Sequence, residues 1–124
     1  MGYDPGETDR SYLYGCLLAI ADKAENDTYD EADRGKRVTN ARRYWANFSQ
    51  RPYQTWQNIE ERLRPYLERH PYRIQIEKWI EEIIDRFSPA TFRDNRRLDP
   101  IYLLGYHHFT MYMFSATKNR KEEK

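Results

Sequence analysis

Basic and aromatic residues are concentrated in the middle third of this 124-residue chain. Ten lysines and arginines lie between Arg34 and Arg73, against three acidic residues in the same segment. Lysine and arginine neutralise phosphates and aromatic rings stack on unpaired bases, so this combination is typical of proteins that bind a single nucleic-acid strand. We expect Tyr44 or Tyr66 to lie beside the basic residues. The segment predicts a polyanion-binding site made by Lys36, Arg37, Arg42, Arg43, Arg62, Arg69 and Arg73.

The same residues also have a purely structural interpretation. Tyrosines and tryptophans commonly fill a helical core, and arginines commonly pair with acids one helical turn away. For each aromatic residue taken alone, a place in the core is the more frequent role. For the basic cluster as a whole, contact with a polyanion is favoured, because three local acids cannot neutralise ten bases. The arginines at 93, 96 and 97 are a candidate extension of the site.

Charge is divided unevenly along the chain. The net charge is only +1, yet residues 1–33 contain nine acids and two bases, so the remaining residues carry a clear positive excess. A near-neutral total therefore conceals a basic surface. We expect the acidic N-terminal part to face solvent or a basic partner, and not nucleic acid.

Other residues with chemical potential are few. His107 and His108 are adjacent, and neighbouring residues of a helix point about 100° apart, so the pair cannot chelate one metal ion. We expect one imidazole to be buried and hydrogen-bonded and the other to lie at a surface or contact. The sequence contains no nucleophile motif, phosphate-binding glycine loop or cysteine cluster. It predicts a protein that is not an enzyme and has no catalytic residues, metal or cofactor; a histidine-dependent hydrolase is an alternative.

Several features predict a cytoplasmic protein that does not contact a membrane. The single cysteine, Cys16, cannot form an intrachain disulfide, and the first residues do not have a basic leader followed by an apolar core. Residues 100–117 lack any charged side chain, but they include two histidines, a glycine and three tyrosines. This composition favours a buried central helix over a membrane span.

Apolar residues recur at spacings of three and four along most of the chain, whereas strict alternation is scarce. The sequence therefore predicts an all-α fold, a compact bundle of about five helices. We expect a single domain over residues 1–124, with 1–7 and 118–124 frayed. The helices are expected at about residues 8–25, 36–49, 52–69, 72–87 and from 100 onward.

Three details of these helices can be tested. The first helix has apolar residues on two faces, which predicts either a central position or docking on a partner. The surroundings of Leu18 and Phe114 are the candidate docking surfaces. Val38 is expected on the buried face of the second helix. Pro65 lies inside the third helical pattern and removes a backbone donor, so a kink or a break is expected there.

Two motifs resemble a known protein family. They are TDRSYLYGCLLAIADKAE at residues 8–25, led by Asp4-Pro5, and LGYHHF at residues 104–109. Together they look like the C-terminal helical region of the large subunit of the type I-C CRISPR Cascade complex, which is also made separately as the small subunit. A chain of this size that begins with Met1 resembles the separate product. A thinner likeness includes RRYW at 42–45, although family members tend to carry small residues where this chain has Trp45 and Asn47.

This resemblance implies a non-catalytic small subunit of an RNA-guided surveillance complex. The implied partners are the large subunit, the backbone subunits, a second copy of the chain and the displaced non-target DNA strand. Guide pairing reads the sequence in such complexes, so this protein would track a DNA backbone without sequence specificity and stabilise the R-loop. The alternative is a helical protein–protein interaction module whose basic helices meet an acidic partner, with no direct nucleic-acid contact.

Overall fold

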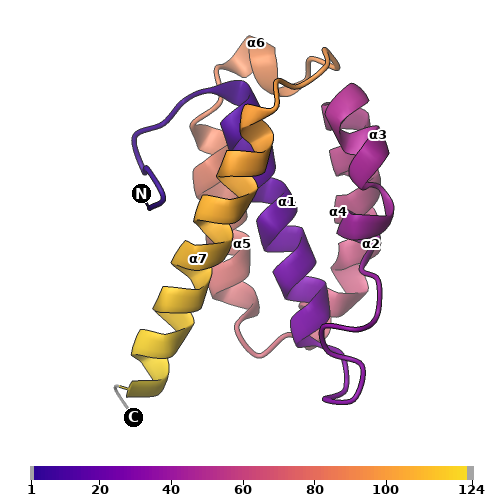
Figure 1. Cartoon of the computed structure of the whole chain (residues 1–124), viewed down its shortest axis with the longest axis vertical. Coiled ribbons are helices and arrows are strands. Elements are labelled where there is room, and N and C mark those ends of the chain that lie inside the picture. The colour runs from indigo at the N-terminus through magenta and orange to yellow at the C-terminus, as the bar shows by residue number, and fades with distance from the viewer. Residues whose placement is uncertain (1, 123–124) are drawn as a thin grey trace.

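Helices make up all the regular structure of residues 2–122, the part of the chain that this computed structural model describes (Figure 1). The predicted all-α fold is therefore confirmed. In chain order the helices are α1 (Arg10–Asp27), α2 (Asn40–Arg43), α3 (Trp45–Gln50), α4 (Pro52–Arg69), α5 (Arg73–Asp85), α6 (Pro89–Phe92) and α7 (Ile101–Glu122). Four of these correspond to predicted helices, one predicted helix is divided into α2 and α3, and α6 lies in a segment predicted to be a linker.

Helix α1 is the central element of the bundle. Its first turn is capped by the side chain of Asp9, which accepts a hydrogen bond from the backbone N–H of Tyr12. Every residue from Ser11 to Asp22 is buried, because α7, α4 and α5 all pack against this helix (Figure 1). Its two apolar faces therefore reflect a central position. Leu18 is fully buried, so its prediction as a docking residue is wrong.

Two glycines allow α1 and α7 to approach closely. A Cβ atom placed on Gly15 would lie 1.9 Å from the carbonyl oxygen of Tyr102, and one on Gly105 would lie 2.1 Å from the carbonyl oxygen of Tyr12. At the same crossing the Cys16 thiol donates to the carbonyl oxygen of Gly105 at 3.6 Å. Any larger residue at either glycine would push the helices apart.

Helix α7 lies on the outside of the bundle. Its Gly105 lies against α1, its buried Phe109 lies against Trp79 of α5, and Met113 is also buried. In contrast, Leu104 and Phe114 are 45% and 69% exposed. The prediction of a buried central helix over residues 100–117 is thus wrong, because α1 occupies the centre and α7 covers it from one side. Within the described residues, no helix is sufficiently long and apolar to cross a membrane.

The chain between α1 and α3 differs most from the expected helix at 36–49. Residues 31–37 form turns that include Gly35 with a φ of 78°, a conformation that favours glycine. Helix α2 begins only at Asn40, because the side chain of Thr39 caps it by accepting from the N–H of Arg42. Val38 consequently lies before the helix and is 53% exposed, so its predicted burial is wrong. Lys36 and Arg37 belong to this connection as well.

Helices α4 and α5 form the other side of the core. Helix α4 continues from Pro52 to Arg69 through Pro65. Of the expected kink or break, the break therefore does not occur. The helix ends at Arg69, with His70 as its C-cap in extended conformation before Pro71. Helix α5 contributes a buried apolar stripe, formed by Ile76, Trp79, Ile80 and Ile83 and followed by Phe87.

Candidate nucleic-acid interface

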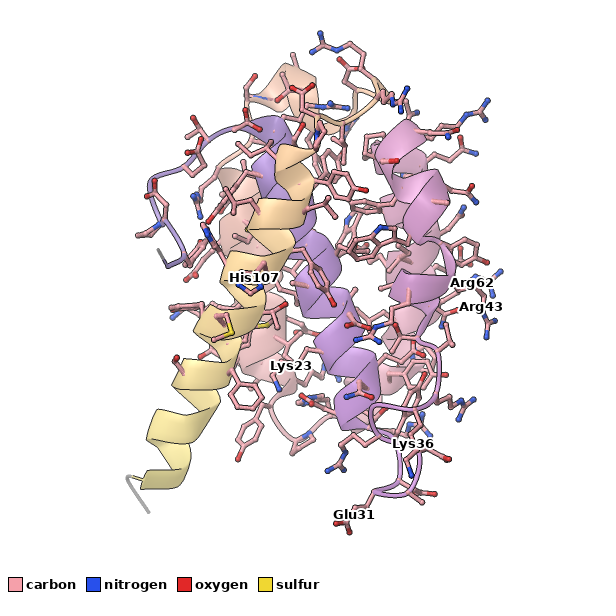
Figure 2. The ribbon with its side chains drawn as sticks, in the orientation of Figure 1. Lys23, Glu31, Lys36, Arg43, Arg62 and His107 are labelled. Atoms are coloured by element: carbon pink, nitrogen blue, oxygen red, sulfur yellow. The ribbon has the colours of Figure 1, made fainter. Side chains whose placement is uncertain are left out.

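One arginine from α2 and one from α4 lie on the same side of the molecule. Arg43 from α2 and Arg62 from α4 project next to each other, and Lys36 lies on the same side in the connection before α2 (Figure 2). His107 on α7 marks the opposite side of the bundle in this view. All three basic residues are exposed, and none forms an ion pair with another described residue. Their charges are therefore available to a partner.

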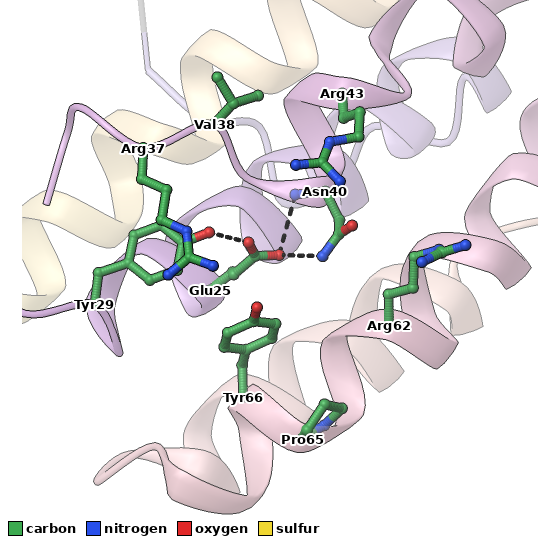
Figure 3. A pocket seen from close by; sticks show the side chains of 9 residues that line it. All are labelled: Glu25, Tyr29, Arg37, Val38, Asn40, Arg43, Arg62, Pro65 and Tyr66. Carbon is green, nitrogen blue, oxygen red and sulfur yellow. Dashed lines mark hydrogen bonds between the residues drawn. The ribbon is translucent and has the colours of Figure 1, made fainter. Parts of the chain in front are cut away.

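A pocket opens between the end of α1, the connection to α2, and α4. Its volume is about 370 Å³. Three of the seven predicted site residues, Arg37, Arg43 and Arg62, line it (Figure 3). The other lining residues are Glu25, Tyr29, Val38, Asn40, Pro65 and Tyr66. The structure therefore brings together basic and aromatic side chains that are separated by up to about forty positions in the sequence.

Glu25 organises this pocket from its floor. The carboxylate is 3% exposed and its Oε1 accepts from the backbone N–H and the side-chain amide of Asn40, at 3.1 and 2.9 Å. Its Oε2 accepts from the hydroxyl of Tyr29. Burial, together with this bond to Glu25, raises the pKa of Tyr29 well above its usual range. The one acid that lines the pocket is thus engaged with neutral donors and pairs with none of the lining arginines.

Several of the predicted arginines form cation–π contacts with tyrosine rings. The guanidinium of Arg62 lies 5.5 Å from the centre of the Tyr44 ring, and that of Arg69 lies 5.3 Å from the Tyr66 ring. These are cation–π distances, and both tyrosines are the ones expected beside the basic cluster. Arg37 lies 4.8 Å from the ring of Tyr29. Each ring orients a cation without neutralising it, so the positive charge of the surface is retained.

Two predicted site residues form ion pairs with acidic side chains of this protein. The Nε of Arg42 lies 3.2 Å from Oδ1 of Asp22, and the charge of Asp22 raises the pKa of Arg42. The Nε of Arg73 lies 2.9 Å from Oε1 of Glu77 on the same helix, and that hydrogen bond raises the pKa of Arg73. Neither residue lines the pocket, and both are less available to phosphate than the sequence suggested.

The carboxylate of Asp22 connects three parts of the fold through hydrogen bonds. Besides Arg42, it accepts from the hydroxyl of Thr39 at 2.6 Å and from the hydroxyl of Tyr106 at 2.8 Å. Burial and the charge of Asp22 raise the pKa of Tyr106 to about 12. Asp22 therefore joins α1, the start of α2 and α7, which makes Arg42 a structural residue in part.

Sequence reasoning missed Tyr29 and Asn40 as pocket residues. Tyr29 lies in the acidic N-terminal part, residues 1–33, which was expected to face solvent or a basic partner and not nucleic acid. The spacing of Glu25 and Tyr29, four residues apart at a helix end, was the available signal, since such residues share a face. Asn40 gave no signal, because its bond to Glu25 depends on the fold of the connection.

The arginines at 93–97 form a separate basic group near α6. The guanidinium of Arg10 donates to the backbone carbonyls of Thr91, Asp94 and Arg96, at 3.1, 2.6 and 2.7 Å, and so shapes this loop. Arg96 pairs with Asp94 at 2.5 Å. None of the predicted extension residues lines the pocket between α2 and α4.

The two histidines of α7 behave as expected. His108 is buried and its Nδ1 lies 3.0 Å from the hydroxyl of Tyr12, whereas His107 is exposed. Across the described part of the chain, no group of three or more histidine, cysteine or acidic residues is placed to hold a metal ion.

Comparison with protein families identifies the group to which this helical bundle belongs. Residues 1–114 match the family of the CRISPR-associated protein Cas_Csd1. A comparison with curated proteins gives no match. The resemblance noted in residues 8–25 and 104–109 is confirmed at the level of a CRISPR-associated protein. Because the match covers most of the 124 residues, the chain belongs to the Cas_Csd1 family of CRISPR-associated proteins.

Proposed function

We propose that this protein is the small subunit of a type I-C Cascade complex and that it binds the displaced non-target DNA strand. Membership of a CRISPR-associated family supports the setting. The observation that carries the DNA-binding role is the grouping of Arg37, Arg43 and Arg62 around one pocket, next to Tyr66 and without ion pairs to described residues. Single-strand binding needs this combination of free cations and aromatic faces.

The proposed mechanism is electrostatic. Exchange of a DNA duplex for a guide–target heteroduplex is nearly balanced in free energy, so contacts to the displaced strand can tip it. Each phosphate that the basic side neutralises releases counterions, which contributes a slope of about −0.7 to the dependence of log K on log salt for a single strand. Three such contacts would give a slope of about −2. Because the contacts are to phosphates, the binding has no sequence preference.

We propose that this role is non-catalytic. Cys16 is buried within α1, and burial raises its pKa to about 12, so the thiol is protonated at neutral pH and is a poor nucleophile. The buried imidazole of His108 faces the hydroxyl of Tyr12, and Tyr12 in turn accepts from the backbone N–H of Asp4 at 3.3 Å. These contacts suit a packing role.

A protein-docking role is the second candidate, and the outer face of α7 favours it. Leu103, Leu104, Met111 and Phe114 are all between 45% and 69% exposed on this helix. Contiguous exposed apolar side chains mark interaction surfaces. Helix α7 lies across the bundle from Arg43 and Arg62 (Figure 2), so α7 can contact other subunits while the basic side contacts DNA. The large subunit, the backbone subunits and a second copy are the proposed partners.

Fluorescence anisotropy with a labelled 40-nucleotide single strand tests the DNA-binding role. The pocket variant is Arg43→Gln with Arg62→Gln, and the control is Arg64→Gln with Lys78→Gln, two exposed residues that line no part of the pocket. Both variants remove two positive charges. We expect the pocket variant to bind at least tenfold more weakly, because charge-assisted hydrogen bonds are lost, and the control to change by less than about threefold.

An equal loss of affinity for the strand in the two variants would contradict the assignment of DNA binding to the pocket surface around Arg43 and Arg62. If the wild-type protein does not bind at low salt, the protein-interaction alternative is favoured and the basic side requires an acidic partner. A slope of log K against log salt near zero would also contradict an electrostatic mechanism.

A further inference from the structure

We propose that the pocket between α2 and α4 accepts one nucleotide unit of the bound strand, with the phosphate between Arg43 and Arg62 and the base against Tyr66. This inference rests on the proposed function and narrows it, because it assigns base contact as well as phosphate contact to a defined place. Figure 3 shows Arg43 on one wall and Arg62 with Tyr66 on the other, with Glu25 between them.

The size of the pocket fits a single nucleotide. A volume of about 370 Å³ lies at the lower end of the range of small-molecule sites. A duplex does not fit such a space, whereas one unit of a flexible single strand can turn into it. The pocket therefore selects for an unpaired strand.

The charges of the pocket divide it into two regions. Glu25 lies at the floor with both oxygens occupied by donors from Tyr29 and Asn40. A phosphate placed there would be repelled by the carboxylate. At the rim, the guanidinium groups of Arg43 and Arg62 have no acidic partner among the described residues and can bind phosphate oxygens. The phosphate therefore belongs at the rim and the neutral base deeper in the pocket.

Apolar and aromatic side chains supply the base contact. Tyr66 is half-buried, and its ring is fixed by the edge of Tyr29 at 6.1 Å and by the guanidinium of Arg69. Val38 lies on the opposite wall of the pocket (Figure 3) and is 53% exposed. It gives the pocket an apolar surface that phosphate does not use. A base inserted between Val38 and Tyr66 would cover it.

The test compares a 12-nucleotide thymidine strand with an abasic strand of the same length and charge. We expect the wild-type protein to bind the thymidine strand at least fivefold more tightly than the abasic strand, because stacking of one base on an aromatic ring contributes a gain in affinity of this size. Tyr66→Phe should retain this preference because the ring remains. Tyr66→Leu should reduce it to less than twofold while leaving affinity for the abasic strand unchanged.

The possible failures can be told apart. Equal binding of both strands by the wild-type protein would overturn base insertion but leave phosphate binding intact. No binding of either strand would overturn the proposed DNA-binding function together with this inference. A preference that survives Tyr66→Leu would place the base contact elsewhere and so contradict the proposal.

A crosslinking measurement on the wild-type chain avoids any folding defect in the variant. A strand with 5-iododeoxyuridine is irradiated with the protein, and the modified peptide is identified by mass spectrometry. The expected crosslinks lie at Tyr66 or Tyr29. Crosslinks found only outside residues 25–66 would overturn the proposal.

A competition experiment separates a strand site from a free-nucleotide site. Thymidine monophosphate at equal nucleotide concentration should not displace the strand, since it lacks neighbouring phosphates. Full displacement would assign the pocket to a free nucleotide instead.

Discussion

Replacing either glycine at the crossing of α1 and α7 should destabilise the protein. In Gly15→Ala the new methyl group would start 1.9 Å from the carbonyl oxygen of Tyr102, and in Gly105→Ala it would start 2.1 Å from that of Tyr12. Separations below 3.0 Å essentially never occur for real Cβ atoms. The obstacle is backbone, so no rotamer change can relieve it. The helices must move apart along their closest approach.

Two opposing effects set the magnitude. Alanine is favoured over glycine in a helix interior by about 1 kcal/mol. Against this, an extra methyl group in a packed core costs about 1–3 kcal/mol. The upper end of that range applies here, because moving α7 also loosens Phe109 and Met113, which are each 1% exposed. The net loss of unfolding free energy is then about 2 kcal/mol.

Urea denaturation followed by circular dichroism measures this loss directly. At about 4 °C per kcal/mol, the melting temperature should fall by about 8 °C. Gly2→Ala is the matched control, because a Cβ there has no neighbour within 4 Å, and it should change stability by less than about 0.5 kcal/mol. The reasoning is refuted if either helical variant is as stable as the wild type, or gains the 1 kcal/mol that propensity alone predicts.

Three further predictions concern Asp22, Asp27 and the outer face of α7. Asp22→Ala should lower the unfolding free energy by about 2–3 kcal/mol in urea titrations, because buried donors lose their acceptor; an unchanged midpoint would contradict this. Burial alone would raise the pKa of Asp27, yet the hydrogen bond with His70 and the charge of Lys23 outweigh it and lower the pKa. The ionised carboxylate therefore stabilises the folded state above the ordinary pKa of about 3.9, and this contribution is lost as the pH falls through the lower pKa of the folded state. Asp27→Asn lacks this contribution, so its unfolding free energy should fall less than that of the wild type between pH values of about 6 and 3. Met111→Ser with Phe114→Ser should weaken incorporation into the assembled complex at least tenfold and leave the melting temperature nearly unchanged, since both side chains are exposed; normal incorporation would argue against docking through α7.

Local chemistry made much of the helical architecture predictable. Asp9 before an apolar run, His70 before Pro71 and the three- and four-residue spacing of α5 each act within a few residues, so they can be read without a fold. Pro65 shows the limit of such rules. Tertiary packing of Ile59 and Leu63 keeps α4 continuous through a residue that would weaken an isolated helix.

The candidate site was only partly predictable for the same physical reason. The basic cluster follows from composition, and three of its members do meet at one pocket. Arg42 and Arg43 are adjacent and chemically identical, yet Arg42 pairs with Asp22 while Arg43 lines the pocket. Their separation by about 100° around α2 directs them to different surroundings. Asp22, which pairs with Arg42, comes from α1, and Arg62, which lines the pocket with Arg43, comes from α4.

The sequence by itself determined the helical content, most core positions and the excess of positive charge in the middle of the chain. Only the tertiary structure decided which of two apolar helices is central. Helices α1 and α7 both carry apolar residues around most of their circumference, but α1 is enclosed by α7, α4, α5 and α2, whereas α7 is covered on one side. The spacing of apolar residues predicts which residues share a face of their own helix. It does not predict which element packs on that face, because the packing residues are distant in the chain.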